Sequence, residues 1–153
     1  MNITLDDNHV YRVSLGGDIK EVPSVTTIMR DVGYYPWVFR DKDEHEIHFP
    51  TENIDRGIEV DPIAKELLPY VQAYRQFKSD NEITITNIEE IVFCEEFWYA
   101  GALDRVMTIN DCPAIVDIKT GTKLTVTGIQ LAAYQYAWEQ MGGEKNLNRF
   151  ALH

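Results

Sequence analysis

Two oppositely charged residues lie at the end of an apolar segment in the last third of the chain. Residues 114–121 read AIVDIKTG, with Asp117 and Lys119 separated by a single position. In a strand these two side chains share one face, while Val116 and Ile118 point to the other face, toward a core. Burying charge is costly unless a partner, a metal ion or water satisfies it. The segment therefore indicates either a salt bridge at the end of a strand or a site that does chemistry.

Asp104 is a second charged residue within an apolar segment, FWYAGALDRV at residues 97–106. If this segment pairs with residues 113–119 as a hairpin, Asp104 and Asp117 can face each other across the sheet. A divalent cation between the two carboxylates would remove their repulsion, and Mg²⁺ prefers carboxylate and carbonyl oxygens as ligands. Lys119 would then lie beside the ion, where it could orient a nucleophilic water or offset charge on a phosphate.

A helix after these strands brings two further polar residues. Residues 127–143 read TGIQLAAYQYAWEQMGG, which predicts a helix that ends at the two glycines. Gln130 and Tyr134 are four positions apart and therefore lie on one helical face. They extend the candidate site if that face meets the sheet. The alternative is a solvated helix edge that carries an amphipathic tyrosine.

The remaining pattern predicts the elements that position these residues. Residues 2–13 alternate between apolar and polar around Asp7 and Asn8, which predicts a hairpin. A short helix follows, with Ser24 as its cap and Gly33 at its end. Strands are predicted over residues 90–95, 97–109 and 113–119, with a turn at 110–111, and residues 149–153 begin one more strand.

A longer helix is predicted in the middle of the chain. Asp61 and Pro62 have the types of an N-cap and a first helical position, and an apolar stripe follows over residues 63–77. Pro69 is expected to kink this helix. Residues 40–61 are charged and weakly periodic, and their pattern indicates no regular element. The order of elements predicts an α/β fold with a mixed central sheet.

Length and composition limit the class of protein. At 153 residues the chain is expected to form one domain, residues 1–153, with an accessory part over residues 1–60 and a core over residues 61–153. No segment has the apolar length of a membrane span or the form of a signal peptide, which predicts a cytoplasmic protein with no membrane partner. Cys94 and Cys112 are too few for a disulfide framework or for a four-cysteine iron–sulfur cluster.

The net charge of −11 opposes nucleic-acid binding, which usually needs a basic surface. An acidic enzyme can still act on DNA where its positive charge is concentrated in a groove. Bound metal ions that offset its carboxylates, or a partner that supplies a basic surface, have the same effect.

Three motifs, taken in order, resemble those of the PD-(D/E)xK nuclease superfamily, and in particular its RecB-like, phage-type exonuclease branch. They are GALD at residues 101–104, DIKTG at residues 117–121 and QLAAY at residues 130–134. A D-x-K motif alone is a weak signal, whereas three motifs in this order on the expected elements are specific. The resemblance implies a restriction-endonuclease-like core, with a mixed sheet flanked by helices and a small accessory hairpin and helix at the amino end.

The resemblance also implies roles for the charged residues. Asp104 and Asp117, with the carbonyl of Ile118, would bind Mg²⁺, for which Mn²⁺ would substitute, and Lys119 would be catalytic. No iron–sulfur cluster is expected, because the cysteines that such a cluster requires are missing.

Further positions match the family less closely. Gln130 and Tyr134 would bind substrate DNA or brace the active site. RecB-like members place a metal-binding histidine in a Gly-x-x-Val-His pattern, and here EHEIH at residues 44–48 makes His48 the candidate ligand, ahead of His45. The alternative for His48 is a surface histidine in a polar loop. Glu90 could match a further family carboxylate, but an exposed glutamate at a strand edge is the preferred interpretation.

The leading hypothesis is a metal-dependent DNA nuclease, an exonuclease, in which a metal-activated water hydrolyses phosphodiester bonds. Its setting would be DNA recombination, repair or phage DNA processing in the cytoplasm of a bacterial or phage-infected cell. The alternative is a degenerate nuclease fold that acts as a DNA-binding or protein-interaction module, favoured by the acidic charge and by the glutamate in place of the family glycine. A structural α/β domain with a salt bridge is a third hypothesis. A protein partner or a homo-oligomer could supply a positively lined DNA channel.

Overall fold

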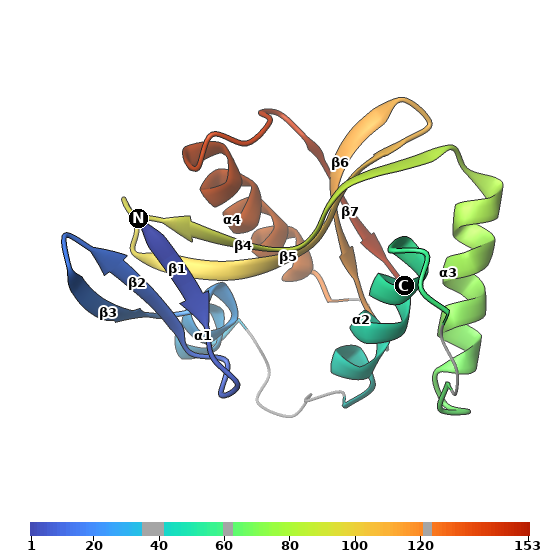
Figure 1. The fold of residues 1–153 in the computed structure, drawn as a ribbon, viewed down its shortest axis with the longest axis horizontal. Coiled ribbons are helices and arrows are strands. Elements are labelled where there is room, and N and C mark those ends of the chain that lie inside the picture. Colours follow the sequence, from blue (N-terminus) through green and yellow to red (C-terminus); the bar gives the residue numbers. More distant parts are fainter. Residues whose placement is uncertain (35–41, 60–62, 121–123) are drawn as a thin grey trace.

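The centre of the molecule is a mixed four-stranded sheet. The computed structural model describes residues 1–34, 42–59, 63–120 and 124–153. The sheet has the order β4 (Ile83–Cys94), β5 (Tyr99–Ile109), β6 (Cys112–Ile118) and β7 (Asn148–Leu152). The first three strands are antiparallel neighbours and β7 is parallel to β6 (Figure 1). This arrangement confirms the predicted mixed α/β fold and is consistent with a restriction-endonuclease-like core.

The hairpin that carries the two aspartates has the predicted turn. Asn110 and Asp111 join β5 to β6 with φ angles of 48° and 63°, the left-handed pair that a two-residue hairpin turn requires. The register pairs Arg105 with Val116. One step further along the hairpin, Asp104 and Asp117 come opposite each other, as expected from the sequence.

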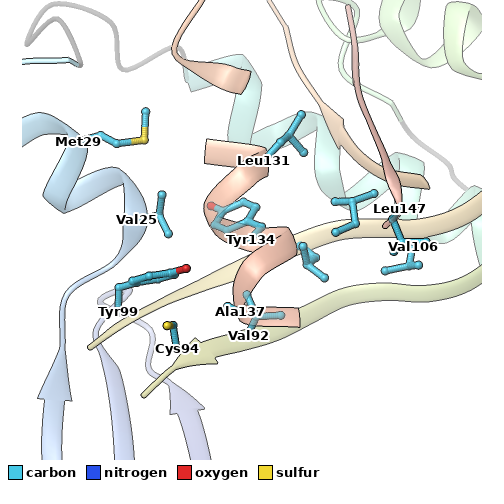
Figure 2. Close-up of a cluster of buried hydrophobic side chains, with 12 residues drawn as sticks. Val25, Met29, Val92, Cys94, Tyr99, Val106, Leu131, Tyr134, Ala137 and Leu147 are labelled. Carbon is cyan, nitrogen blue, oxygen red and sulfur yellow. The ribbon is translucent and has the colours of Figure 1, made fainter. Parts of the chain in front are cut away.

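Helices cover both faces of this sheet. Helix α4 (Thr127–Gln140) and the shorter α1 (Val25–Asp31) pack on one face of the sheet. On this face they contact a buried cluster that includes Ile115 of β6. Figure 2 shows Val25 and Met29 of α1 directed toward Leu131 and Tyr134 of α4, in the largest group of buried side chains. Helices α2 (Lys42–Asp55) and α3 (Leu68–Asp80) lie side by side on the other face (Figure 1), where they enclose Ile118 of β6.

A small sheet forms the amino-terminal part. Strands β1 (Asn2–Leu5) and β2 (Tyr11–Leu15) are the predicted hairpin, and β3 (Asp18–Val22) extends it. The sequence pattern does not predict β3 because its first four residues are exposed and lack the alternation of a half-buried strand. Helix α1 is capped as predicted, since the Ser24 Oγ accepts a hydrogen bond of 3.0 Å from the Thr27 amide, and Gly33 follows with a φ of 82°.

Three expectations for the middle helices are wrong. Pro69 lies in the first turn of α3, where backbone N–H groups have no partner within the helix. The missing N–H of proline therefore costs no hydrogen bond there, and Pro69 does not kink the helix. Residues 42–55 form α2 although their pattern indicates no element, because much of the buried side of this helix is polar and Pro50 lies within it. The expected cap at Asp61 and Pro62 lies outside the described residues, but the helix predicted to follow it from residue 63 begins only at Leu68, because residues 63–67 form no helix. None of the described helices is long and apolar enough to cross a membrane.

Candidate metal centre

Three ligand-type side chains from three different elements converge in the structure. His48 comes from α2, Glu89 from β4 and Asp104 from β5, and one ligand atom of each lies within 4.8 Å of the others. The His48 Nδ1 is 3.5 Å from the Glu89 Oε1 and 3.6 Å from the Asp104 Oδ1. Asp104 is buried, whereas His48 and Glu89 are partly exposed, so the cluster is reachable from solvent.

Asp104 is fixed by the neighbouring strand. The Ile118 amide donates a hydrogen bond of 2.6 Å to the Asp104 Oδ2, which leaves the Oδ1 directed at His48. Burial raises the pKa of Asp104, and the negative charge of Glu89 raises it further. His48, Lys119 and the Ile118 amide offset only part of this effect. A buried carboxylate in this environment lacks sufficient positive charge, which is the deficit that a cation would fill.

Glu89 reaches the cluster through an unusual backbone conformation. Its φ is 52°, in the left-handed region that residues other than glycine seldom adopt. The register pairs Ile88 with Arg105 and Glu90 with Leu103, so Glu89 stands beside Asp104 across the β4–β5 pair. The Arg105 Nη1 donates to the Glu89 Oε1 at 2.9 Å. Burial alone would raise the pKa of Glu89, but His48 and Arg105 outweigh it and hold this pKa below the ordinary value.

The sequence pattern indicates Glu90 as a possible family carboxylate and gives no role to Glu89. In the structure Glu90 accepts a hydrogen bond of 3.3 Å from the Asn87 side chain and does not belong to the cluster of ligand atoms. Two adjacent glutamates in a strand face opposite sides, so one of them had to share a side with Asp104. Which one could not be determined without the register, and the bulge between Ile85 and Asn87 shifts that register.

Asp117 and Lys119 form a pair next to this cluster. The Lys119 Nζ is 3.1 Å from the Asp117 Oδ2, so the two side chains share a face as the sequence pattern indicated. Both are largely buried, at 3% and 11% side-chain exposure. Asp117 is not among the three residues whose ligand atoms lie within 4.8 Å of one another. The structure thus brings His48, Glu89 and Asp104 together and places Asp117 and Lys119 beside them.

The predicted pair on α4 is buried against the sheet. The Gln130 Nε2 donates to the Tyr134 hydroxyl at 2.9 Å, and both side chains are buried. Figure 2 shows Tyr134 on α4 within the largest group of buried side chains. Its ring explains the glycine of GALD, because a Cβ added at Gly101 would lie 2.3 Å from the Tyr134 Cε1. Burial raises the pKa of Tyr134, and the nearby charges of Asp117 and Asp104 act in the same direction. The helix face is therefore no solvated edge.

A sequence model of the PD-(D/E)XK nuclease superfamily matches residues 41–152. The chain belongs to this superfamily. The matched region begins just before α2 and ends in β7, so it includes every element that contributes to the cluster. No curated protein matches the chain at a significant level. Membership in the superfamily indicates a nuclease, a phosphodiester hydrolase that uses divalent metal ions, with DNA as the implied substrate.

The residues of this nuclease fit a divalent ion. The buried Nδ1 of His48 has no hydrogen-bond partner among the described residues, although it faces two carboxylates. Burial opposes a charge on His48, yet Glu89 and Asp104 outweigh burial and raise the pKa of His48 to about 8. A set of one imidazole nitrogen and two carboxylates suits a divalent metal ion. The two carboxylates thus favour a positive charge at this position. The side chain of His45 lies outside the described residues.

Proposed function

We propose that this chain is a metal-dependent deoxyribonuclease of the RecB-like, phage-type branch of its superfamily, and that it acts as an exonuclease. The single observation that carries the proposal is the convergence of His48, Glu89 and Asp104 within 4.8 Å, beside the pair of Asp117 and Lys119. Two buried carboxylates, Asp104 and Asp117, close to a third from Glu89 are costly for a fold that has no use for them. Metal-dependent hydrolysis gives that use.

Each residue has a role in the proposal. His48, Glu89 and Asp104 would hold the ion, and Asp117 with the carbonyl of Ile118 would complete the set of ligands. The bound ion supplies Lewis acidity, which lowers the pKa of a water molecule and offsets charge on the scissile phosphate. Since Mg²⁺ keeps several of its waters, this set leaves room for substrate.

Lys119 is the group proposed to act on the reacting atoms. Its ammonium lies 3.1 Å from Asp117, and its side chain is largely buried. From there it can orient the attacking water or stabilise the negative charge that develops on the phosphate. The positive charge of Lys119 also lowers the pKa of Asp104, so Lys119 acts electrostatically on a residue of the candidate metal site.

The assignment to the RecB-like branch rests on two features. The first is a histidine on a helix that precedes the sheet, here His48 on α2, whose Nδ1 faces Asp104. The second is the Gln130 and Tyr134 pair on α4, which braces the strand that carries Asp104 through the close approach to Gly101. We further propose that residues 1–153 act as one domain, in the cytoplasm, on DNA.

One observation favours a second candidate. The net charge of −11 opposes DNA binding, as expected for a degenerate nuclease fold that serves as a binding module. A partner protein or a homo-oligomer with a basic channel would reconcile this charge with nuclease activity.

The test of the proposed function is cleavage of end-labelled linear DNA and of a covalently closed circle, with Mg²⁺ or Mn²⁺ and with a chelator as the control. Cleavage of the linear form alone identifies an exonuclease, and cleavage of both forms identifies an endonuclease. Binding of DNA or of a protein partner without any cleavage would replace the proposal by the module.

A further inference from the structure

Arg105 follows Asp104 directly and is completely buried, with a side-chain exposure of 0%. Its Nε donates to the Asp55 Oδ2 at 2.6 Å, and its Nη1 donates both to the Glu89 Oε1 at 2.9 Å and to the Asp104 backbone carbonyl at 2.6 Å. Its Nη2 donates to the Thr51 Oγ1 at 3.3 Å. Every nitrogen of the guanidinium therefore has a partner.

These contacts connect Arg105 to all three residues of the candidate metal site, His48, Glu89 and Asp104. Arg105 holds the carboxylate of Glu89 directly, and it holds Asp104 through its backbone carbonyl. It reaches the third member less directly, through Thr51, whose hydroxyl donates to the carbonyls of Ile47 at 2.8 Å and His48 at 3.0 Å. The planar guanidinium thus contacts groups on α2, β4 and β5, the three elements that carry the candidate ligands. Its rigid geometry fixes how these groups are oriented relative to one another.

The left-handed backbone of Glu89 makes this support necessary. A φ of 52° is unfavourable for glutamate and persists only where the surrounding structure enforces it. The Glu89 Oε1 accepts from Arg105 and lies 3.5 Å from the His48 Nδ1, so the guanidinium holds the carboxylate next to His48. Without the guanidinium, the backbone could relax and turn Glu89 out of the cluster.

We infer that Arg105 is a positioning residue for the metal site. It sets the distance of Glu89 from His48 and Asp104 and has no contact with substrate. The inference rests on the proposed function, because it requires Glu89 to be a metal ligand. Hydrogen-bonded groups behind metal ligands commonly change metal affinity or activity by about 10- to 100-fold when they are replaced.

The alternative is that Arg105 has a purely structural role. It binds Asp55 of α2, and the same carboxylate joins α2 to α3. The Asp55 carboxylate accepts hydrogen bonds of 2.7 Å from Lys78 and of 2.7 Å from the Tyr74 hydroxyl. Lys78 is therefore a matched control. It is the other cation on Asp55, it is distant from Glu89 in the network, and replacing it disturbs the same link between the helices.

The experiment is a calorimetric titration of the metal-free protein with Mn²⁺, together with thermal unfolding of each variant. Arg105→Lys keeps the charge but loses the fork, and we expect its Mn²⁺ affinity to fall about 10- to 100-fold. Lys78→Met should lower the melting temperature and leave the affinity close to that of wild type. Equal affinities of wild type and Arg105→Lys would overturn the inference, as would an equal loss in Lys78→Met.

A double-mutant cycle tests whether Arg105 acts through Glu89. Once Glu89→Gln has weakened the ligand, Arg105→Lys should cost less affinity than it does in the wild-type background. Losses that multiply independently would overturn the inference. If wild type itself binds no Mn²⁺, the proposed function fails and the inference fails with it, whereas normal wild-type binding with an unaffected Arg105→Lys removes the inference alone.

A crystal structure of the wild-type protein soaked with Mn²⁺ decides the matter even if the arginine variants do not fold. We expect Glu89 on the ion with its hydrogen bond to Arg105 retained. Glu89 away from the ion, or on the ion without that hydrogen bond, would show that Arg105 does not position it.

Discussion

The amide of Ile118 donates a hydrogen bond of 2.6 Å to the Asp104 Oδ2, and this contact joins the two motifs of the site across the β5–β6 hairpin. It fixes one carboxylate oxygen of Asp104 and leaves the other directed at His48. Because the donor is a backbone amide, no substitution on β6 removes it except proline at position 118. The position of Asp104 is consequently set by the hairpin itself.

We predict from this arrangement that Asp104→Asn abolishes Mn²⁺ binding without unfolding the protein. The amide keeps an oxygen that can accept from Ile118, but it removes the charge that offsets the cation. Calorimetric titration with Mn²⁺ measures the first effect and thermal unfolding the second. Asp117→Asn should also weaken binding. Unchanged binding in both variants would refute the assignment of these carboxylates to the metal.

The two adjacent glutamates of β4 provide an internal comparison. Glu89 belongs to the metal cluster, whereas Glu90 is hydrogen-bonded to Asn87 outside it. Glu89→Gln should lower Mn²⁺ affinity and DNA cleavage by about 10-fold or more, because a charged ligand is lost while its shape is kept. Glu90→Gln should leave both measurements near their wild-type values. The reverse result would mean that β4 has another register in solution.

Much of this site follows from the sequence, and the limits have physical reasons. The alternation of Asp117 and Lys119, the turn after β5 and the helical spacing of Gln130 and Tyr134 are local, so pattern reasoning predicts them. The position of Glu89 depends on a register shift in β4, and a bulge leaves no clear signature in a hydrophobic pattern.

Helix α2 was missed for a related reason. Its buried residues include Thr51, whose environment is the guanidinium of Arg105 in place of an apolar core. A helix that buries polar groups against a buried cation has a weak hydrophobic period. Family resemblance identified His48 where periodicity could not.

The contact between Gly101 and Tyr134 predicts a pair of glycine substitutions with opposite effects. A Cβ at Gly101 would lie 2.3 Å from the Tyr134 ring, so Gly101→Ala must displace that buried ring and should destabilise the fold by about 1–3 kcal/mol. Gly128 in α4 has no atom within 4 Å of an added Cβ. Gly128→Ala should therefore stabilise the fold by up to about 1 kcal/mol through helix propensity. Chemical denaturation measures both, and equal effects would argue against the close approach of α4 to β5.

The last prediction concerns Lys119 and separates an enzyme from a binding module. Lys119→Met keeps most of the apolar stem and deletes the charge, so an interaction that strengthens in the transition state is lost while ground-state contacts largely remain. DNA cleavage should fall on the order of 10² to 10³-fold, the usual cost of one such electrostatic contact.

Metal binding, unlike cleavage, should not be weakened by Lys119→Met. The substitution removes the cation 3.1 Å from Asp117, so Mn²⁺ affinity should stay the same or rise. The readout is turnover of linear DNA beside a calorimetric Mn²⁺ titration, with Lys78→Met as the control for loss of a lysine elsewhere. Equal cleavage by wild type and Lys119→Met would retain the nuclease but remove Lys119 from its chemistry. Loss of Mn²⁺ binding together with turnover would instead make Lys119 a structural support of the metal site, because a group that acts only on the phosphate does not control whether the ion binds.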